Sequence, residues 1–301
     1  MPVIEVTDLR KRYGTKQAVD GVSFSVERGE IFGILGPNGA GKTTTVECVE
    51  GLRRADSGRI DVLGLDPASD GARLRRRIGV QLQSSELPDR IKVWEALDLY
   101  ASFYDDPADW RELLEDWGLG EKRDAYFGKL SGGQKQRVSI ALALIGRPEI
   151  VVFDELTAAL DPQARRDTWR LVEQIRERDV TVLLVTHFMD EAEHLCDRLA
   201  VIDAGKVVAV DSPAGLIDSV RTGQKLRMRI EGEWRREVLS DLPEVEQVGG
   251  DGTRVEVSGT GNLVYAVIAA LARAEVLATD IRLEQPSLDD AFVALTGRRI
   301  A

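Results

Sequence analysis

Three short apolar runs dominate the hydrophobic pattern of the chain, and polar residues follow each of them immediately. The runs cover residues 31–35, 150–153 and 180–185. A glycine-rich loop follows the first run, an acidic pair the second and a histidine the third. Continuous apolar runs separated by helical periodicity are typical of buried parallel strands, whose carboxyl ends lie along one edge of a sheet. The pattern therefore predicts an α/β fold with a mainly parallel core sheet and one site at its edge.

The rest of the pattern predicts three further parts. Alternation over residues 3–10 and 22–26 indicates an antiparallel side sheet, and helical periodicity over about residues 84–146 indicates a helical subdomain. Farther along the chain, short alternating runs flank one apolar helix, which is typical of a small α+β domain. We expect two domains, formed by residues 1–221 and residues 222–301.

Composition narrows the functions that this fold could serve. The 301 residues carry a formal net charge of −11, which disfavours nonspecific binding to nucleic acid. The two cysteines, Cys48 and Cys196, lie far apart in the sequence, and their spacing indicates neither a disulfide framework nor a zinc site. No secretory signal and no apolar stretch long enough to span a bilayer are found. We expect a cytoplasmic protein without direct membrane insertion, which would act at a membrane through a partner.

The glycine-rich loop has the spacing that cradles a nucleotide triphosphate, Gly-x-x-x-x-Gly-Lys-Thr, between an apolar strand and a helix. Its glycines let backbone N–H groups point at phosphate oxygens, and the helix presents its positive end. We expect Lys42 to reach the β- and γ-phosphates of ATP, and Thr43 to ligate Mg²⁺. The candidate ATP-binding residues of this segment are Gly36, Pro37, Asn38, Gly39, Ala40, Gly41, Lys42, Thr43 and Thr44.

Asp154 and Glu155 end the second apolar run, where adjacent side chains point in different directions. They can therefore take different roles on one nucleotide. We expect Asp154 to hold Mg²⁺, and Glu155 to accept a proton from the water that attacks the γ-phosphate. Two adjacent acids alone more often belong to a solvated turn. They indicate a nucleotide site here because the glycine-rich loop lies upstream.

A second helix start is also suited to phosphate. The sequence Ser131-Gly132-Gly133-Gln134 supplies a capping hydroxyl and exposed N–H groups at the start of a helix. A chain with one nucleotide site has little need of two such termini, unless the second serves the nucleotide of another molecule. The sequence therefore predicts a head-to-tail dimer with two shared sites.

Over residues 1–220 the chain resembles ATP-binding cassette (ABC) ATPases, which carry the glycine-rich loop, the Leu-Ser-Gly-Gly-Gln signature and the Asp-Glu strand end in the same order. The resemblance implies a P-loop NTPase fold and ATP hydrolysis. It also implies roles for single residues. Gln83 would touch Mg²⁺ and sense a transmembrane partner, with Gln81 competing for this role. His187 would contact the γ-phosphate, and Tyr13 would stack on adenine. The nucleotide held by the partner subunit would be bound in trans by Ser131, Gly132, Gly133, Gln134 and Asp161.

Two residues depart from the usual pattern of that family. Leu156 stands where proline commonly follows the catalytic glutamate, and Ala159 stands where glycine or a small polar residue is common. Neither change removes a reacting group, but both can alter loop stiffness, and with it turnover.

The last residues, 285–297, resemble more loosely the extension of daunorubicin-resistance-type ABC ATPases. This resemblance implies an export motor for a drug- or lipid-like cargo, with a separate permease of the ABC-2 type and a place on the cytoplasmic face of the membrane. The alternatives are a membrane machine that does not transport, or a soluble ABC ATPase acting on DNA or ribosomes. A homodimer and a paired heterodimer both stay open.

Overall fold

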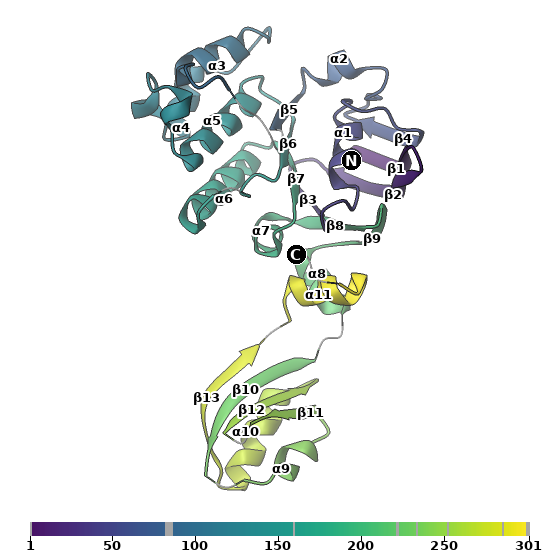
Figure 1. The fold of residues 1–301 in the computed structure, drawn as a ribbon, viewed down its shortest axis with the longest axis vertical. Helices are drawn as coiled ribbons and strands as arrows, with labels where there is room; N and C mark the ends of the chain where they lie inside the picture. Colours follow the sequence, from purple (N-terminus) through teal and green to yellow (C-terminus); the bar gives the residue numbers. More distant parts are fainter. Residues whose placement is uncertain are drawn as a thin grey trace. The chain divides into compact units, whose positions relative to one another are not determined.

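The fold is known from a computed structural model, shown in Figure 1. The structure describes residues 2–81, 87–158, 160–220, 223–232, 234–251, 253–284 and 286–298. The chain divides into two compact units. The first consists of Met1–Leu216 with Leu295–Ala301, and the second of Ile217–Ala294.

The centre of the first unit is a six-stranded sheet. Its strands, in spatial order, are β5 (Ile78–Gln81), β6 (Ile150–Asp154), β7 (Thr181–Thr186), β3 (Ile31–Leu35), β8 (Arg198–Asp203) and β9 (Lys206–Asp211). All pairs are parallel except β8 with β9. Every residue of β3, β6 and β7 is buried. The three apolar runs are thus neighbouring strands of one mainly parallel sheet, which confirms the prediction.

An antiparallel side sheet packs beside the core sheet. It consists of β2 (Lys16–Glu27), β1 (Pro2–Tyr13) and β4 (Ser57–Val62), in that order. The two strands expected from alternation are present, and β4 adds a third. Phe24 of β2 stacks on Phe32 of β3 with ring centroids 5.4 Å apart, within one hydrophobic core that both sheets share. The side sheet is therefore an integral part of the first unit.

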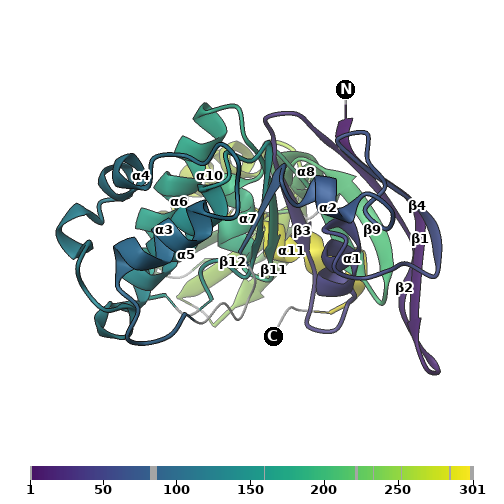
Figure 2. The same ribbon diagram turned by 90° about the horizontal axis from the view of Figure 1, so that it is seen from above.

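Helices cover the two sides of the six-stranded sheet. In chain order they are α1 (Lys42–Val49), α2 (Gly71–Leu74), α3 (Val93–Ala101), α4 (Trp110–Asp116), η1 (Gly120–Lys122), η2 (Phe127–Lys129), α5 (Gly132–Leu144), α6 (Pro162–Glu177) and α7 (Met189–Leu195). A further helix, α8 (Pro213–Ser219), extends past Leu216, where this part of the first unit ends. Figures 1 and 2 show α1 on one side of the sheet and α3 to α6 on the other. In the part of the chain that the structure describes, no helix is long and apolar enough to cross a membrane.

The second unit has its own sheet and core. Its strands lie in the order β11 (Val245–Gly250), β12 (Arg254–Gly259), β10 (Gln224–Glu231) and β13 (Leu277–Glu284), all antiparallel. Helices α9 (Glu237–Ser240) and α10 (Leu263–Arg273) pack with this sheet around an apolar core. The last helix is α11 (Leu288–Thr296). Alternation in β10 buries Leu226, Met228 and Ile230, as expected for a strand with one covered face.

Candidate functional site

The glycine-rich loop connects β3 to α1, and Lys42 is the first residue of that helix. Lys42 is only 6% exposed, and its Nζ donates to Gly36 O at 2.7 Å and to Pro37 O at 3.1 Å. Burial lowers the pKa of Lys42, while Glu155 and Asp154 oppose that shift. The ammonium is thus held inside the loop by carbonyl groups, which a bound anion can replace.

Two glycines of this loop lie against backbone that leaves no room for a side chain. A Cβ at Gly36 would lie 2.1 Å from Ile202 O, and one at Gly41 would lie 2.4 Å from Ala18 O. Gly41 also has φ 104°, in the left-handed region, and caps α1. The first turn of a helix leaves its N–H groups without helical acceptors, which favours an anion at this end. The loop therefore fits a polyphosphate.

The other members of the segment fill the loop and the first helical turn. Asn38 and Gly39 are exposed at its tip, Pro37 is half-buried, and Ala40 is buried. Thr43 is exposed and Thr44 half-buried in α1. The nine residues of this segment predicted to bind ATP thus form the loop between β3 and α1 together with the first turn of α1.

Asp154 ends β6 at the same edge of the sheet. It is 6% exposed, and its Oδ1 is buried without a hydrogen-bond partner in the described structure. Burial and the Glu155 carboxylate raise the pKa of Asp154 to about 6, against the opposing effects of Lys42 and the Thr43 hydroxyl. This carboxylate and the Thr43 hydroxyl are hard oxygen donors that suit Mg²⁺.

The described residues hold no cluster of three or more His, Cys, Asp or Glu side chains that could bind a metal. Mg²⁺ in nucleotide sites is usually held by one or two protein oxygens together with phosphate oxygens and water. The donors beside Asp154 fit an ion of that kind, for which a nucleotide must complete the coordination.

Glu155 and His187 face each other across neighbouring strands. Glu155 follows β6, His187 follows β7, and His187 Nδ1 lies 3.1 Å from Glu155 Oε1. Both side chains are mostly buried, at 15% and 20% exposed. Glu155 has φ 52°, an uncommon backbone conformation for a residue with a side chain, and its N–H donates to Val185 O at 2.9 Å. The carboxylate and the imidazole therefore lie within hydrogen-bond distance of each other beside the ends of β6 and β7.

Tyr13 is the last residue of β1, and its ring is 40% exposed. The Arg53 guanidinium lies 5.2 Å from the ring centroid, and Lys11 Nζ lies 5.8 Å from it. Helix α1 packs on β1, and Arg53 lies just beyond the end of that helix. The side sheet thus holds an accessible aromatic ring next to the chain that leaves the phosphate-binding helix.

Two positions of interest fall outside the described residues, namely Gln83 and Ala159. Gln81, which competes with Gln83 for the same role, is the last residue of β5 and is buried. Leu156, the residue after Glu155, is buried at 1% exposed. The chain therefore buries an apolar side chain at the position where ABC ATPases commonly have proline.

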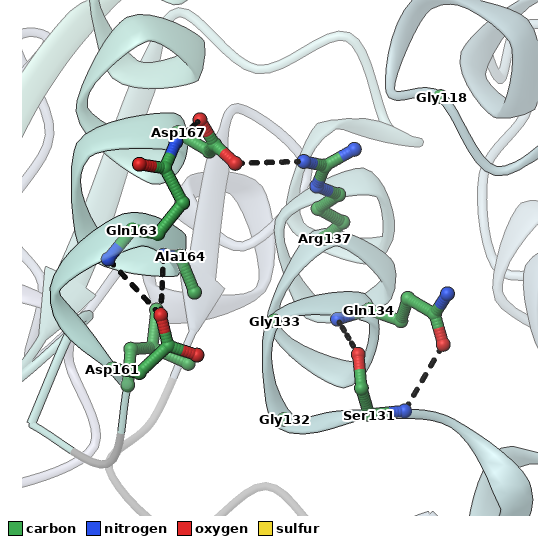
Figure 3. Close-up of a pocket in the computed structure, with 11 residues that line it drawn as sticks. Gly118, Ser131, Gly132, Gly133, Gln134, Arg137, Asp161, Gln163, Ala164 and Asp167 are labelled. Atoms are coloured by element: carbon green, nitrogen blue, oxygen red, sulfur yellow. Dashed lines mark hydrogen bonds and ion pairs between the residues drawn. The ribbon is translucent and has the colours of Figure 1, made fainter.

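The Ser-Gly-Gly-Gln segment opens α5 as expected. Ser131 Oγ accepts the Gln134 N–H at 3.3 Å, and the Gln134 side chain accepts the Ser131 N–H at 3.0 Å. This reciprocal cap fixes the helix terminus while Ser131 and Gly132 stay exposed. A cavity of about 510 Å³ lies between this terminus and α6. Figure 3 shows Ser131 and Asp161 at corresponding ends of the two helices.

Asp161 caps α6 on the other side of that cavity. Its Oδ1 accepts N–H groups from Gln163 at 3.0 Å and from Ala164 at 2.9 Å. Gly133 allows the close approach of the helices, because a Cβ there would lie 3.2 Å from the Ala164 Cβ. Two helix termini therefore border one cavity, each capped by a side chain that already accepts N–H groups of its first turn.

Sequence reasoning missed several buried polar groups around the site. Glu50, at the C-terminus of α1, is 2% exposed, and burial together with Asp154 and Glu47 raises its pKa to about 8. Glu191 on α7 is fully buried. Across the α5–α6 cavity, Arg137 Nη2 lies 3.8 Å from Asp167 Oδ2. Glu50 could have been found, since it lies four residues after the apolar Val46 on the same face of a helix.

A family model described as ABC transporter matches residues 19–158. The chain is 36% identical over 319 residues to the Nod factor export ATP-binding protein I of Burkholderia lata, covering 100% of this chain and 99% of that protein. It is 39% identical over 306 residues to the protein of the same name from a Rhizobium species, strain N33, covering 99% of this chain and 98% of the relative.

Solved structures of ABC transporter proteins also match this chain. The structure of cbiO1 from Clostridium perfringens, described as part of the ABC transporter complex cbiONQ, matches with a TM-score of 0.66 at 29% identity. The match covers 72% of this chain and 91% of that one. A dimeric structure of MJ0796, a bacterial ABC transporter cassette, matches with a TM-score of 0.62 at 25% identity, covering 69% and 98% of the two chains.

Proposed function

Because this chain belongs to the ABC transporter family as an ATP-binding subunit, we propose that it is the ATP-hydrolysing motor of an exporter and that it works as a dimer on a separate permease. The observation that carries the export assignment is the match to export ATP-binding proteins over the whole chain, including its last eighty or so residues. A match confined to the cassette would have left the direction of transport open.

We assign the steps of hydrolysis to residues at the carboxyl edge of the core sheet. Lys42 and the N–H groups of the glycine-rich loop bind the β- and γ-phosphates of ATP, and Tyr13 stacks on its adenine. Thr43 and Asp154 would hold Mg²⁺, and Gln83 would be a further ligand. When bound, Mg²⁺ neutralises charge on the phosphate oxygens. Support comes from the unpaired Asp154 Oδ1 and from the fit of the loop to a polyphosphate.

Glu155 acts as the general base. It accepts a proton from the attacking water at its carboxylate, and His187 contacts the γ-phosphate. The 3.1 Å contact between His187 Nδ1 and Glu155 Oε1 supports this assignment, because it holds the two side chains next to each other. The mostly buried setting of both side chains strengthens charge interactions by excluding water.

Dimerisation completes each site. Helix α5 lies on the other side of the six-stranded sheet from α1, the helix into which the glycine-rich loop leads, as Figures 1 and 2 show. We therefore propose a second chain as the source of the second phosphate contact. We propose that Ser131, Gly132, Gly133 and Gln134 bind the γ-phosphate held by the partner copy, and that Asp161 lies at the same interface. Two copies would close around two ATP molecules, and closure would drive the permease.

The cargo and the place of action follow from the relatives and the C-terminal resemblance. The relatives are named for export of Nod factor. We propose a drug- or lipid-like cargo for this chain and a position on the cytoplasmic face of the membrane, reached through the permease. Residues 222–301 would form the accessory domain, and no nucleic acid is expected as a partner because of the net charge of −11.

The test is capture of the assembled pump. Tagged Glu155→Gln protein, expressed in its native cell, is isolated from gently solubilised membranes with ATP and Mg²⁺, and the proteins that come with it are identified. We expect stoichiometric recovery of one multi-span membrane protein, whereas the Ser131→Arg variant, which cannot close the dimer, should recover less. Recovery of ribosomes or DNA-bound proteins without a membrane protein would refute the exporter assignment while leaving the ATPase assignment standing.

A further inference from the structure

Glu191, in the first turn of α7, is an acidic residue without exposed surface. Burial raises its pKa, since a carboxyl group removed from water is costly unless hydrogen bonds satisfy it. An apolar side chain of similar volume would fill the same space at lower cost. The role of this carboxyl should therefore be to hold the groups that donate hydrogen bonds to it.

Donors from three different elements converge on the Glu191 carboxyl. Thr157 Oγ1 donates to Oε1 at 2.8 Å, and Trp169 Nε1 donates to the same oxygen at 3.3 Å. The Thr186 hydroxyl also favours the charged form. Oε2 forms no hydrogen bond of standard geometry in the described structure, and the Thr157 bond to Oε1 is shorter than the Trp169 bond.

Two of these donors adjoin the candidate catalytic pair. Thr157 lies two residues after Glu155, and Thr186 immediately precedes His187. Glu155 occupies a strained backbone conformation with φ 52°, which persists only when its surroundings hold it. The carboxyl of Glu191 therefore links the loop that carries one member of the pair to the strand end that carries the other.

Helices α6 and α7 are also held together without Glu191. Arg165 Nη1 lies 3.2 Å from Asp190 Oδ2, and its guanidinium lies 4.3 Å from the Phe188 ring centroid. The ring centroids of Trp169 on α6 and His194 on α7 are 4.7 Å apart. Loss of the Glu191 carboxyl should therefore disturb the two loops more than the packing of the helices.

We propose that Glu191 is a positioning residue for ATP hydrolysis, whose carboxyl fixes the loop after Glu155 to the strand end before His187 and so sets the geometry of that pair. The inference rests on the proposed function, in which these two residues act on the γ-phosphate.

Four variants separate this role from general stability. Glu191→Ala removes the acceptor, and Glu191→Gln keeps a carbonyl oxygen in the same place. Thr157→Val removes the donor of the shorter bond. The matched control is Thr168→Val, because the Thr168 hydroxyl is also buried and donates to Ala164 O at 2.8 Å, within α6 and away from the pair.

The first measurement needs no nucleotide. The chain contains two histidines, so the imidazole resonances of nitrogen-labelled protein are few, and that of His187 is identified by its loss in His187→Ala. We expect this resonance to shift in Glu191→Ala and Thr157→Val, and to keep its position in Thr168→Val. Equal shifts in all three variants, or none in Glu191→Ala, would overturn the proposal.

The second measurement separates kcat from KM. Small misplacement of reacting groups costs up to about 100-fold in rate. We expect Glu191→Ala to lower kcat about 10- to 100-fold with KM for ATP within about twofold, because the glycine-rich loop is untouched, and Glu191→Gln to recover most of the rate. Parallel changes in kcat and KM, or a rate equal to that of Thr168→Val, would contradict the proposal. Should the wild-type protein hydrolyse no ATP, the proposed function fails, and the resonance of His187 still decides whether Glu191 positions it.

Discussion

Replacing Glu50 by glutamine should stabilise the first unit, and more so as the pH rises. Glu50 is 2% exposed at the C-terminus of α1, where burial, Asp154 and Glu47 raise its pKa from 4.5 to about 8. In the unfolded chain the same carboxyl titrates near its ordinary value. A folded pKa above the unfolded one means that this group's contribution to stability is complete below about pH 4.5 and is lost as the pH rises through about 8.

The size of the effect follows from proton linkage. Between pH 5 and pH 8 the unfolded chain has already released the Glu50 proton, while the folded protein still holds most of it. Each pH unit in this window lowers the free energy of unfolding by up to about 1.4 kcal/mol, and the whole window by about 3 kcal/mol. Glutamine carries no titrating proton, so the variant should lack this loss.

Urea unfolding at pH 5, 6, 7 and 8 measures the difference. Tryptophan fluorescence reports mainly on the first unit, which contains Trp94, Trp110, Trp117 and Trp169. The control is Glu193→Gln, which removes an exposed acid. We expect Glu50→Gln to gain about 3 kcal/mol on wild type between pH 5 and pH 8, and the control to follow wild type. Parallel curves for wild type and Glu50→Gln would refute the reasoning, because Glu50 would then be ionised in the folded protein.

Three further predictions concern the nucleotide. Lys42→Ala should weaken Mg-ATP binding about 10- to 100-fold, because charge-assisted hydrogen bonds contribute about 1.5–3 kcal/mol, and titration with a fluorescent ATP analogue measures this; unchanged affinity would contradict it. Mg-ATP affinity should fall as the pH drops below about 6, the raised pKa of Asp154, because a proton then competes with Mg²⁺, and calorimetric titration should show this loss reduced in Asp154→Asn. Tyr13→Ala should lower ATP affinity by about 1–3 kcal/mol without affecting inorganic triphosphate, a difference that competition binding would reveal.

Much of the fold could be predicted because the sequences of its central strands have a clear hydrophobic pattern. The segments that form β3, β6 and β7 are mainly apolar runs. A glycine-rich loop, an acidic pair and a histidine follow these three runs in the sequence. The edge strands lack this signal. β4 has three exposed residues of six, and β5 has four residues in all, so tertiary pairing rather than local pattern determines them.

The candidate site shows the same division. The spacing of the glycine-rich loop predicts where Lys42 begins its helix, and the Ser131 cap follows from its sequence. The buried residues that hold the site in place, such as Glu191, have no such pattern in the sequence. Glu191 lies four residues before the apolar Leu195, which places it on the buried face of α7, but no sequence pattern indicates which groups hold its carboxyl there. Its burial arises from Thr157 and Trp169, which come from other parts of the chain.

The central claim is that one chain's glycine-rich loop and another chain's Ser131 terminus enclose the same ATP. Light scattering on size-separated Glu155→Gln protein, with and without ATP and Mg²⁺, tests it most directly. We predict a monomer without nucleotide and twice that mass with it, and a monomer under both conditions when Ser131→Arg is added to Glu155→Gln. A Glu155→Gln protein that binds ATP and stays monomeric, or dimerises equally with Ser131→Arg, would contradict the account.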